Sequence, residues 1–202
     1  MNHIFYILLF VSLSITVSSQ QALTVKLNEN SKLTINGSTN INTFSFHQTG
    51  DKMKQREISL TSKLTGNRLE AGKHQVGIEV REFKSADPIA QVAFYKMMKT
   101  DEYPSLYIRL INYELTHSEA NNSKGKATVD ITIVGKTLRY EIPVTTGRNS
   151  NIWRFKGNKR LSIKDFGLTP PEPVFGMVKV SEWIDIYMDL HCAIDGVQLV
   201  SN

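Results

Sequence analysis

The sequence has 202 residues, of which 41% are hydrophobic and 21% charged, and it contains a single cysteine. This composition excludes a disordered chain, a collagen-like repeat and a disulfide-rich scaffold, and the length fits one domain or at most two. The formal net charge of +5 is too small to specify a nucleic acid or an anionic membrane as the partner. Cys192 has no second cysteine with which to pair, and we expect a buried, unreactive thiol.

The first residues are typical of a secretory signal peptide. No Lys, Arg, Asp or Glu precedes Lys26, and residues 4–13 are almost purely apolar. Small residues follow, and Val-Ser-Ser at 17–19 is a pattern that signal peptidase accepts. The apolar run is about half of the ~20 residues that span a bilayer. We therefore predict a signal peptide over residues 1–19 and a single domain over residues 20–202, with an uncleaved membrane anchor as the alternative.

From Ser31 onward, apolar residues recur at every second position, which is the pattern of antiparallel strands with one buried face. Turn-forming residues separate the runs, among them Gly66-Asn67 and Gly157-Asn158. About eight strands with no change of composition predict an all-β domain. Because closure removes exposed sheet edges, we expect an eight-stranded antiparallel barrel. The runs are Leu33/Ile35, Phe44/Phe46, Ile58/Leu60, Val76/Ile78/Val80, Leu106/Ile108/Leu110, Val129/Ile131/Ile133, Leu138/Tyr140/Ile142/Val144, Leu161/Ile163 and Ile184/Ile186/Met188/Leu190.

One segment breaks the period of two and predicts a short helix. Asp87 is suited to cap the start of this helix, Pro88 fits its first turn, and we expect it to end near Thr100. Two placements remain open, a lid or plug over one end of the barrel and a helix packed on the outside of the sheet. The apolar positions with helical spacing are Ile89, Val92, Ala93 and Met97.

No residue pattern indicates a catalytic or metal site. The segment from Gly66 to Lys73 fails as a phosphate loop, because five residues separate its glycines where the motif needs four. Asp165-Phe166-Gly167 matches the magnesium triplet of kinases by its letters, but the catalytic-loop sequence is absent. The histidines have no zinc-binding spacing. We therefore expect no catalytic residue, no metal and no cofactor, while an enzyme of unrecognised type stays open as an alternative.

The densest basic stretch extends from Arg148 to Arg160 and contains Trp153 and Phe155. Exposed aromatic and basic residues together are able to bind single-stranded nucleic acid. A hairpin with one solvated face explains the same stretch, and elsewhere basic residues alternate with acidic ones. We therefore predict no nucleic-acid partner.

Four segments, in this order, share their pattern with one known family. They are Ser31–Phe44, Met98–Pro104, Thr132–Thr137 and Asp165–Leu168, the last followed by Gly176 and Val180. Together they resemble the YceI-like family of exported bacterial proteins that bind polyisoprenoids and other amphiphiles, and the similarity extends over residues 24–194. The chain departs from the family pattern at Arg81-Glu82. The resemblance implies a lipocalin-like barrel that holds a lipid chain, with helical cover near one end and a periplasmic or secreted location.

The resulting hypothesis is a non-catalytic, exported protein that holds a polyisoprenoid or another long-chain amphiphile inside the barrel. Aliphatic walls suit such a ligand, because each methylene moved out of water contributes ~0.8 kcal/mol. The alternative is a structural or surface-interaction protein with a filled barrel. We expect no membrane span after signal cleavage, and a monomer and a homodimer are both compatible with the sequence.

A set of inward-facing positions on the alternating runs is predicted to line the lipid site, with two methionines near its entrance. A polar head group would need outer residues such as Arg81, Lys99 or Arg109. The predicted lipid-binding residues are Phe44, Phe46, Val76, Ile78, Val80, Met97, Met98, Leu106, Ile108, Leu110, Val129, Ile131 and Ile133.

Overall fold

The structure is a computed structural model that describes residues 20–53, 55–119, 122–171 and 177–196. The predicted signal peptide, residues 1–19, lies outside the described residues. The strands are β1 (Gln20–Leu27), β2 (Lys32–Ser38), β3 (Thr43–Thr49), β4 (Glu57–Thr65), β5 (Arg68–Ala71), β6 (Val76–Glu79), β7 (Ser105–Ser118), β8 (Asn122–Ile133), β9 (Lys136–Asn149), β10 (Ile152–Ser162) and β11 (Trp183–Asp195). The helices are α1 (Pro88–Met97) and the short 3₁₀ helices η1 (Gly50–Lys52), η2 (Val80–Glu82) and η3 (Ile163–Phe166).

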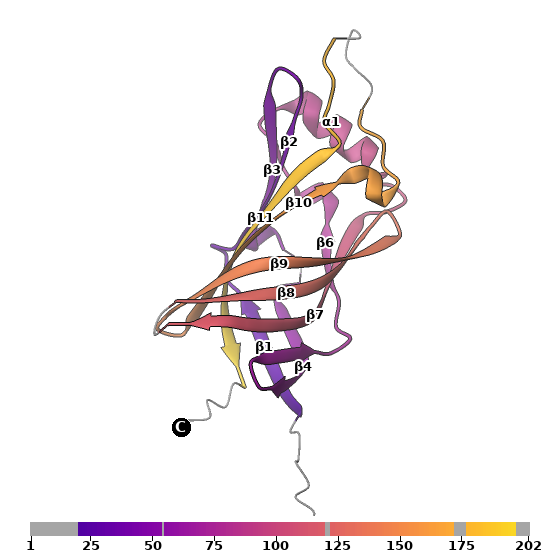
Figure 1. Ribbon diagram of the computed structural model, residues 1–202. Helices are drawn as coiled ribbons and strands as arrows, with labels where there is room; N and C mark the ends of the chain where they lie inside the picture. Colours follow the sequence, from indigo (N-terminus) through magenta and orange to yellow (C-terminus); the bar gives the residue numbers. More distant parts are fainter. Residues whose placement is uncertain (1–19, 54, 120–121, 172–176, 197–202) are drawn as a thin grey trace, which may run out of the picture.

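Eight strands form a closed antiparallel ring, which confirms the predicted barrel. They follow one another in the order β1-β4-β5-β7-β8-β9-β10-β11, and β11 pairs back with β1. The hairpin β2–β3 and the short strand β6 extend this ring at one end. Figure 1 shows that end beside α1, with β1 and β4 at the opposite end of the molecule. We call these two parts the helix end and the far end.

Two long strands change partner along their length, and this change divides the barrel into its two ends. Residues 185–189 of β11 pair with β2, whereas residues 192–195 pair with β1. Residues 105–108 of β7 pair with β6, whereas residues 112–114 pair with β5. At the helix end, a backbone bridge joins β3 to the segment after η2. The far end is closed by β1, β4 and β5.

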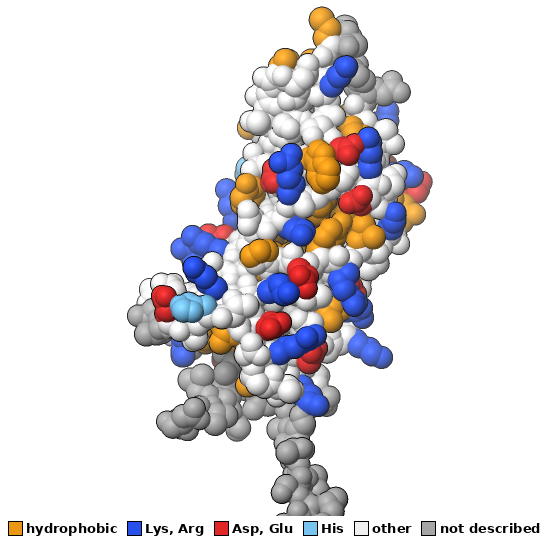
Figure 2. All heavy atoms as spheres, in the orientation of Figure 1, with side chains coloured by type: hydrophobic (Ala, Val, Ile, Leu, Met, Phe, Trp, Pro, Cys, Tyr) orange, Lys and Arg blue, Asp and Glu red, His pale blue; other side chains and the backbone are white. Residues whose placement is uncertain are grey.

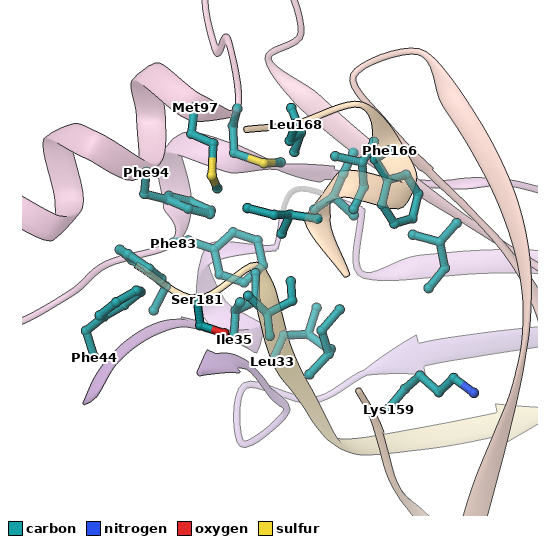
Figure 3. Close-up of a pocket in the computed structure, with 18 of the residues that line it drawn as sticks. Leu33, Ile35, Phe44, Phe83, Phe94, Met97, Lys159, Phe166, Leu168 and Ser181 are labelled. Carbon is teal, nitrogen blue, oxygen red and sulfur yellow. The ribbon is translucent and has the colours of Figure 1, made fainter. Parts of the chain in front are cut away.

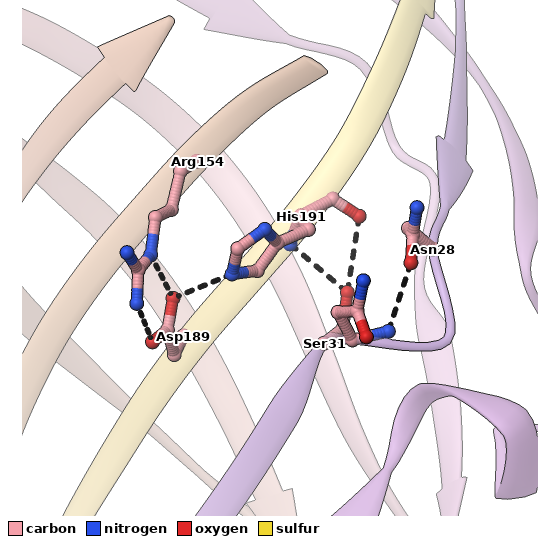
Figure 4. Close-up of polar contacts among 6 residues, drawn as sticks. Asn28, Ser31, Arg154, Asp189 and His191 are labelled. Carbon is pink, nitrogen blue, oxygen red and sulfur yellow. Dashed lines mark hydrogen bonds and ion pairs between the residues drawn. The ribbon is translucent and has the colours of Figure 1, made fainter. Parts of the chain in front are cut away.

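A hydrogen-bonded turn between β1 and β2 fixes the point at which β11 changes partner (Figure 4). Ser31 is fully buried; its Oγ donates to the carbonyl oxygen of His191 at 3.0 Å and accepts from the N–H of His191 at 2.9 Å. The N–H of Asn28 donates to the same carbonyl oxygen at 2.7 Å. Nearby, Arg154 donates two hydrogen bonds to Asp189, on the same strand as His191. The turn thus supplies hydrogen-bond partners for the backbone of β11 at His191, between the part of the strand that pairs with β2 and the part that pairs with β1.

The main hydrophobic core occupies the helix end. It joins the inner faces of β2, β3, β8, β9 and β10 to α1 and η3. A smaller group, Leu23, Ile58 and Cys192, is buried at the far end. Burial raises the pKa of the Cys192 thiol to about 12, and the side chain is 2% exposed, as expected for an unreactive cysteine.

The sequence pattern predicts the number of strands in the ring but assigns some of them wrongly. The ring includes β1 and β5, which the alternating runs missed, and it excludes β2, β3 and β6, which they included. The predicted turn at Gly157-Asn158 is wrong, because both residues lie inside β10. Gly157 is needed there for space, since a Cβ would lie 2.8 Å from Cε of Met188 and 3.1 Å from Cγ2 of Ile142.

The predicted helix is confirmed by α1, which ends three residues before the expected position. The Asp87 carboxylate accepts hydrogen bonds from the N–H groups of Ile89 and Ala90, at 2.9 and 3.0 Å. These bonds satisfy donors that the first turn of a helix otherwise leaves free. Pro88 occupies the first helical position, where its missing N–H has no consequence.

A cluster of three charged side chains crosses the outer face of β7, β8 and β9. Arg109, Asp130 and Arg139 lie opposite one another in register. Asp130 is 8% exposed and accepts hydrogen bonds from Arg139 Nε at 2.7 Å and Arg109 Nη2 at 2.6 Å. The hydrogen bonds from Arg139, supported by Arg109, lower the pKa of Asp130 to about 2. The cluster therefore stabilises the charged carboxylate and the register of three strands.

Ser31→Ala removes the hydroxyl and leaves the His191 N–H without its acceptor in a buried place. We expect the free energy of unfolding, measured by urea denaturation, to fall by about 1–3 kcal/mol. Ser45→Ala, at an exposed position of β3, is the control and should change this free energy by less than about 0.5 kcal/mol. Equal stability of Ser31→Ala and the wild type would contradict the role of the turn.

Asp130→Asn removes a charge that is stabilised in the folded state. Because the folded pKa is lowered, wild-type Asp130 adds stability above the pKa of the unfolded chain, and this contribution disappears as the pH falls toward 2. At neutral pH we expect a loss of about 1–2 kcal/mol, since both arginines are partly solvated. The difference should narrow steadily between about pH 4 and pH 2. Glu141→Gln, in an exposed ion pair on β9, is the control; a loss for Asp130→Asn that does not depend on pH would contradict the account.

Candidate ligand-binding cavity

A largely apolar cavity lies inside the barrel at the helix end (Figure 3). Its volume is about 280 Å³, near the lower limit of the roughly 300–1,000 Å³ that is typical of ligand pockets. The wall takes residues from β2, β3, β6 to β11 and α1, and none from β1, β4 or β5. The cavity therefore ends where β7 and β11 change partner, and the far end of the barrel forms its floor.

Helix α1 covers the cavity. Of the two predicted placements, a lid over one end of the barrel and a helix packed on the outside of the sheet, the structure has the lid. Phe94, on its inner face, is 5% exposed and stacks on Phe46 of β3, with ring centroids 4.2 Å apart. Phe83 packs edge-on against the ring of Phe94, with centroids 6.2 Å apart. Val92, on the outer face, is 69% exposed. Ile89 borders the cavity and is 76% exposed, so the cavity opens to solvent beside the first turn of α1.

The segment Asp165-Phe166-Gly167-Leu168 builds another part of the wall. Its first two residues are the last two of η3, whose first turn is capped by the Ser162 hydroxyl. Gly167 ends this short helix at φ 77°, a conformation that favours glycine. Phe166 and Leu168 are thereby directed into the cavity, where both are buried. The triplet that matches a kinase motif by its letters is a turn that shapes the wall.

Most of the predicted lipid-binding residues line this cavity. Its wall includes Phe44, Phe46, Ile78, Met97, Met98, Leu106, Ile108, Val129, Ile131 and Ile133.

Three predicted residues, Val76, Val80 and Leu110, lie in the packed core beside the cavity and do not line it. Val80 is 1% exposed and belongs to η2, because the chain leaves β6 just before it. Leu110 comes directly before a register shift in β7, which ends the alternation that the sequence pattern assumes. Val76 is the first residue of β6 and packs against the core.

Other lining residues were missed by the prediction. Several lie on strands whose hydrophobic alternation was recognised, so the same alternation identifies them. Phe166 lies in one of the segments that resemble the known family. Neither the alternation nor the family segments include Phe83 or Phe94. These residues include Leu33, Ile35, Phe83, Phe94, Ile142, Ile163, Phe166, Leu168, Ile184, Ile186 and Met188.

Few polar side chains border the cavity. The head-group candidates Arg81, Lys99 and Arg109 are not among them; Arg81 pairs with Asp101 at 2.7 Å and Arg109 with Asp130. The charged residues that border the cavity are Asp87, which caps α1, and Lys159 of β10. The polar lining residues are Thr39, Asp87, Asn158, Lys159 and Ser181.

The outer surface carries charges of both signs. On the face shown in Figure 2, basic and acidic side chains are interspersed, with apolar side chains between them. Within the described ranges, no three His, Cys, Asp or Glu side chains come together as a metal site. None of the helices in these residues has both the length and the apolar character that a bilayer-spanning segment requires.

Comparisons with known proteins agree with the geometry. The model of the YceI-like domain matches residues 30–192. A polyisoprenoid-binding domain from Saccharophagus degradans is 8% identical, with a TM-score of 0.58 over 86% of this chain and 98% of that chain. BcnA from Burkholderia cenocepacia is 17% identical, with a TM-score of 0.55 over 82% and 98%. At these identities the two structures show a shared fold. No curated protein matches the chain.

Proposed function

The chain belongs to the YceI-like family, and we propose that it is an exported bacterial protein that holds a polyisoprenoid or another long-chain amphiphile under α1 without chemically changing it. The observation that carries this proposal is the apolar cavity, which opens beside the first turn of α1. A mostly apolar wall suits a hydrocarbon chain, because dispersion contacts need no directional partner.

The hydrocarbon contacts in such a cavity favour binding. About ten buried methylenes contribute roughly 8 kcal/mol before ordering costs. Because micromolar affinity corresponds to about 8 kcal/mol net, the ligand needs contacts beyond these ten methylenes to reach it. Because the cavity is near the lower limit for ligand pockets, a longer chain must extend through the opening or displace wall side chains. Met97, the last residue of α1, and Met98, which follows it, both line the cavity and are flexible enough to make this space.

Two further observations support the ligand class and the export. The similar domain from Saccharophagus degradans is described as polyisoprenoid binding. The first 19 residues have the character of a signal peptide, because they carry no Lys, Arg, Asp or Glu and an apolar run is followed by small residues. We propose a periplasmic or secreted location on this basis. A purely structural role with a filled barrel is the weaker alternative, since the described interior retains an open cavity.

The test is organic extraction of the purified protein followed by mass spectrometry, together with titration of added lipids. We expect a long-chain apolar molecule in the extract. Ala93→Phe places a ring in the cavity from the inner face of α1, and we expect at least about a tenfold loss of affinity.

Val92→Phe adds the same ring to the exposed face of α1 and serves as the matched control, with unchanged affinity. The proposal is wrong if the extract contains no lipid and added lipids of several chain lengths leave the melting temperature unchanged.

A further inference from the structure

The hydrogen-bonded ladder between β9 and β10 stops partway along both strands. It extends from Ile152 to Gly157, which lies opposite Val144. Beyond this point β10 continues to pair with β11, and β9 continues to pair with β8. The barrel wall is therefore split between residues 136–143 of β9 and 158–162 of β10. Figure 1 shows the two strands diverging, and η3 contacts both of them.

Tyr140 of β9 lies beside this split with an unused hydrogen-bonding group. Its ring lies 6.2 Å from that of Phe166, and it is opposite Val129 in register; both of these residues line the cavity. The hydroxyl oxygen is buried and has no hydrogen-bond partner among the described residues. Burial, with the charge of Asp165, raises the pKa of Tyr140, so the hydroxyl remains a donor at neutral pH. Buried hydroxyls nearly always have a partner, and this one lacks an acceptor.

Lys159 borders the cavity from the other side of the split. Its Nζ lies 5.6 Å from the centroid of the Tyr140 ring, and it makes no ion pair with any described residue. Of the charged residues on η3, which contacts β10, Lys164 is paired with Glu182, and Asp165 is exposed. Figure 3 shows Lys159 well separated from Phe44 of β3 and Phe94 of α1. The cavity is thus bordered by Phe44 and Phe94 under α1 and by Lys159 beside the split, where the ring of Tyr140 lies next to the ammonium group.

We propose that Lys159 and Tyr140 form a head-group site at the split, and that the amphiphile ends in an anionic oxygen group, a carboxylate or a phosphate. The inference rests on the proposed function, because the chain of the same ligand occupies the apolar cavity. An anionic oxygen accepts from both donors and offsets the ammonium charge, and such charge-assisted bonds are stronger than those to a neutral alcohol. The chain then extends from the split toward α1.

The experiment compares ligands that differ only in their head group, with affinity measured by displacement of a fluorescent lipid. Palmitate is paired with palmityl alcohol, and farnesyl phosphate with farnesol. The wild type should bind at least one anion about tenfold more tightly than its alcohol, and the preferred anion identifies the head group. Lys159→Met should remove this preference while affinity for the alcohols stays within about twofold.

Tyr140→Phe separates binding from stability. It should weaken anion binding about threefold or more without lowering the melting temperature, because it removes a buried hydroxyl that has no partner. Lys156→Met, on the same strand with an exposed side chain, is the control and should leave the preference intact.

Equal binding of anions and alcohols by the wild type would overturn the head-group site and leave the proposed function in place. An equal loss of preference in Lys156→Met and Lys159→Met would overturn the site in the same way. If neither anions nor alcohols bind, the proposed function fails, and this inference fails with it.

Discussion

Strand β11 is continuous, yet it pairs with β2 along its first part and with β1 along its second, and the rest of the barrel depends on this change of partner. The backbone groups of His191, between the two ladders, are satisfied by the fully buried Ser31 and by Asn28. Without these partners, buried polar groups would be left unpaired at the centre of the wall. The two ends of the barrel have different strands, and the cavity lies at the helix end, where β2, β3 and β6 contribute to its wall and β1, β4 and β5 do not.

The internal space lowers the stability of the protein without ligand, and its presence is therefore an argument for ligand binding. An apolar cavity of about 280 Å³ left empty costs on the order of several kcal/mol relative to a filled core. Stacking of Phe94 on Phe46 holds α1 over the cavity, and the Asp87 cap fixes the start of the helix. The fold therefore maintains an apolar volume under α1 at the expense of packing, which suits a protein whose interior is completed by a ligand.

Alternating hydrophobic residues were enough to predict an antiparallel barrel, because each buried strand face repeats every two residues. Helical spacing with Asp87-Pro88 was enough to predict α1. Strand pairing was not predictable in the same way: β5 has four residues, too few to show a period, and the alternation of β1 lies next to the signal-like segment. For the cavity, strand positions such as Ile131 followed from the pattern, whereas Phe83 and Phe94 depend on how α1 packs. Lys159 and Tyr140 become neighbours only because the wall splits after Gly157.

The central claim is that the ligand chain lies inside the barrel under α1, and the methionines allow a direct measurement. Met97, Met98 and Met188 line the cavity, whereas Met53 is buried elsewhere in the core and Met177 is 73% exposed. In protein labelled with ¹³C at the methionine methyl groups, NMR contacts to a bound lipid chain should involve the methyls of Met97, Met98 and Met188, and not those of Met53 or Met177. Contacts confined to Met177, or none at the three cavity methyls under saturating lipid, would contradict the account.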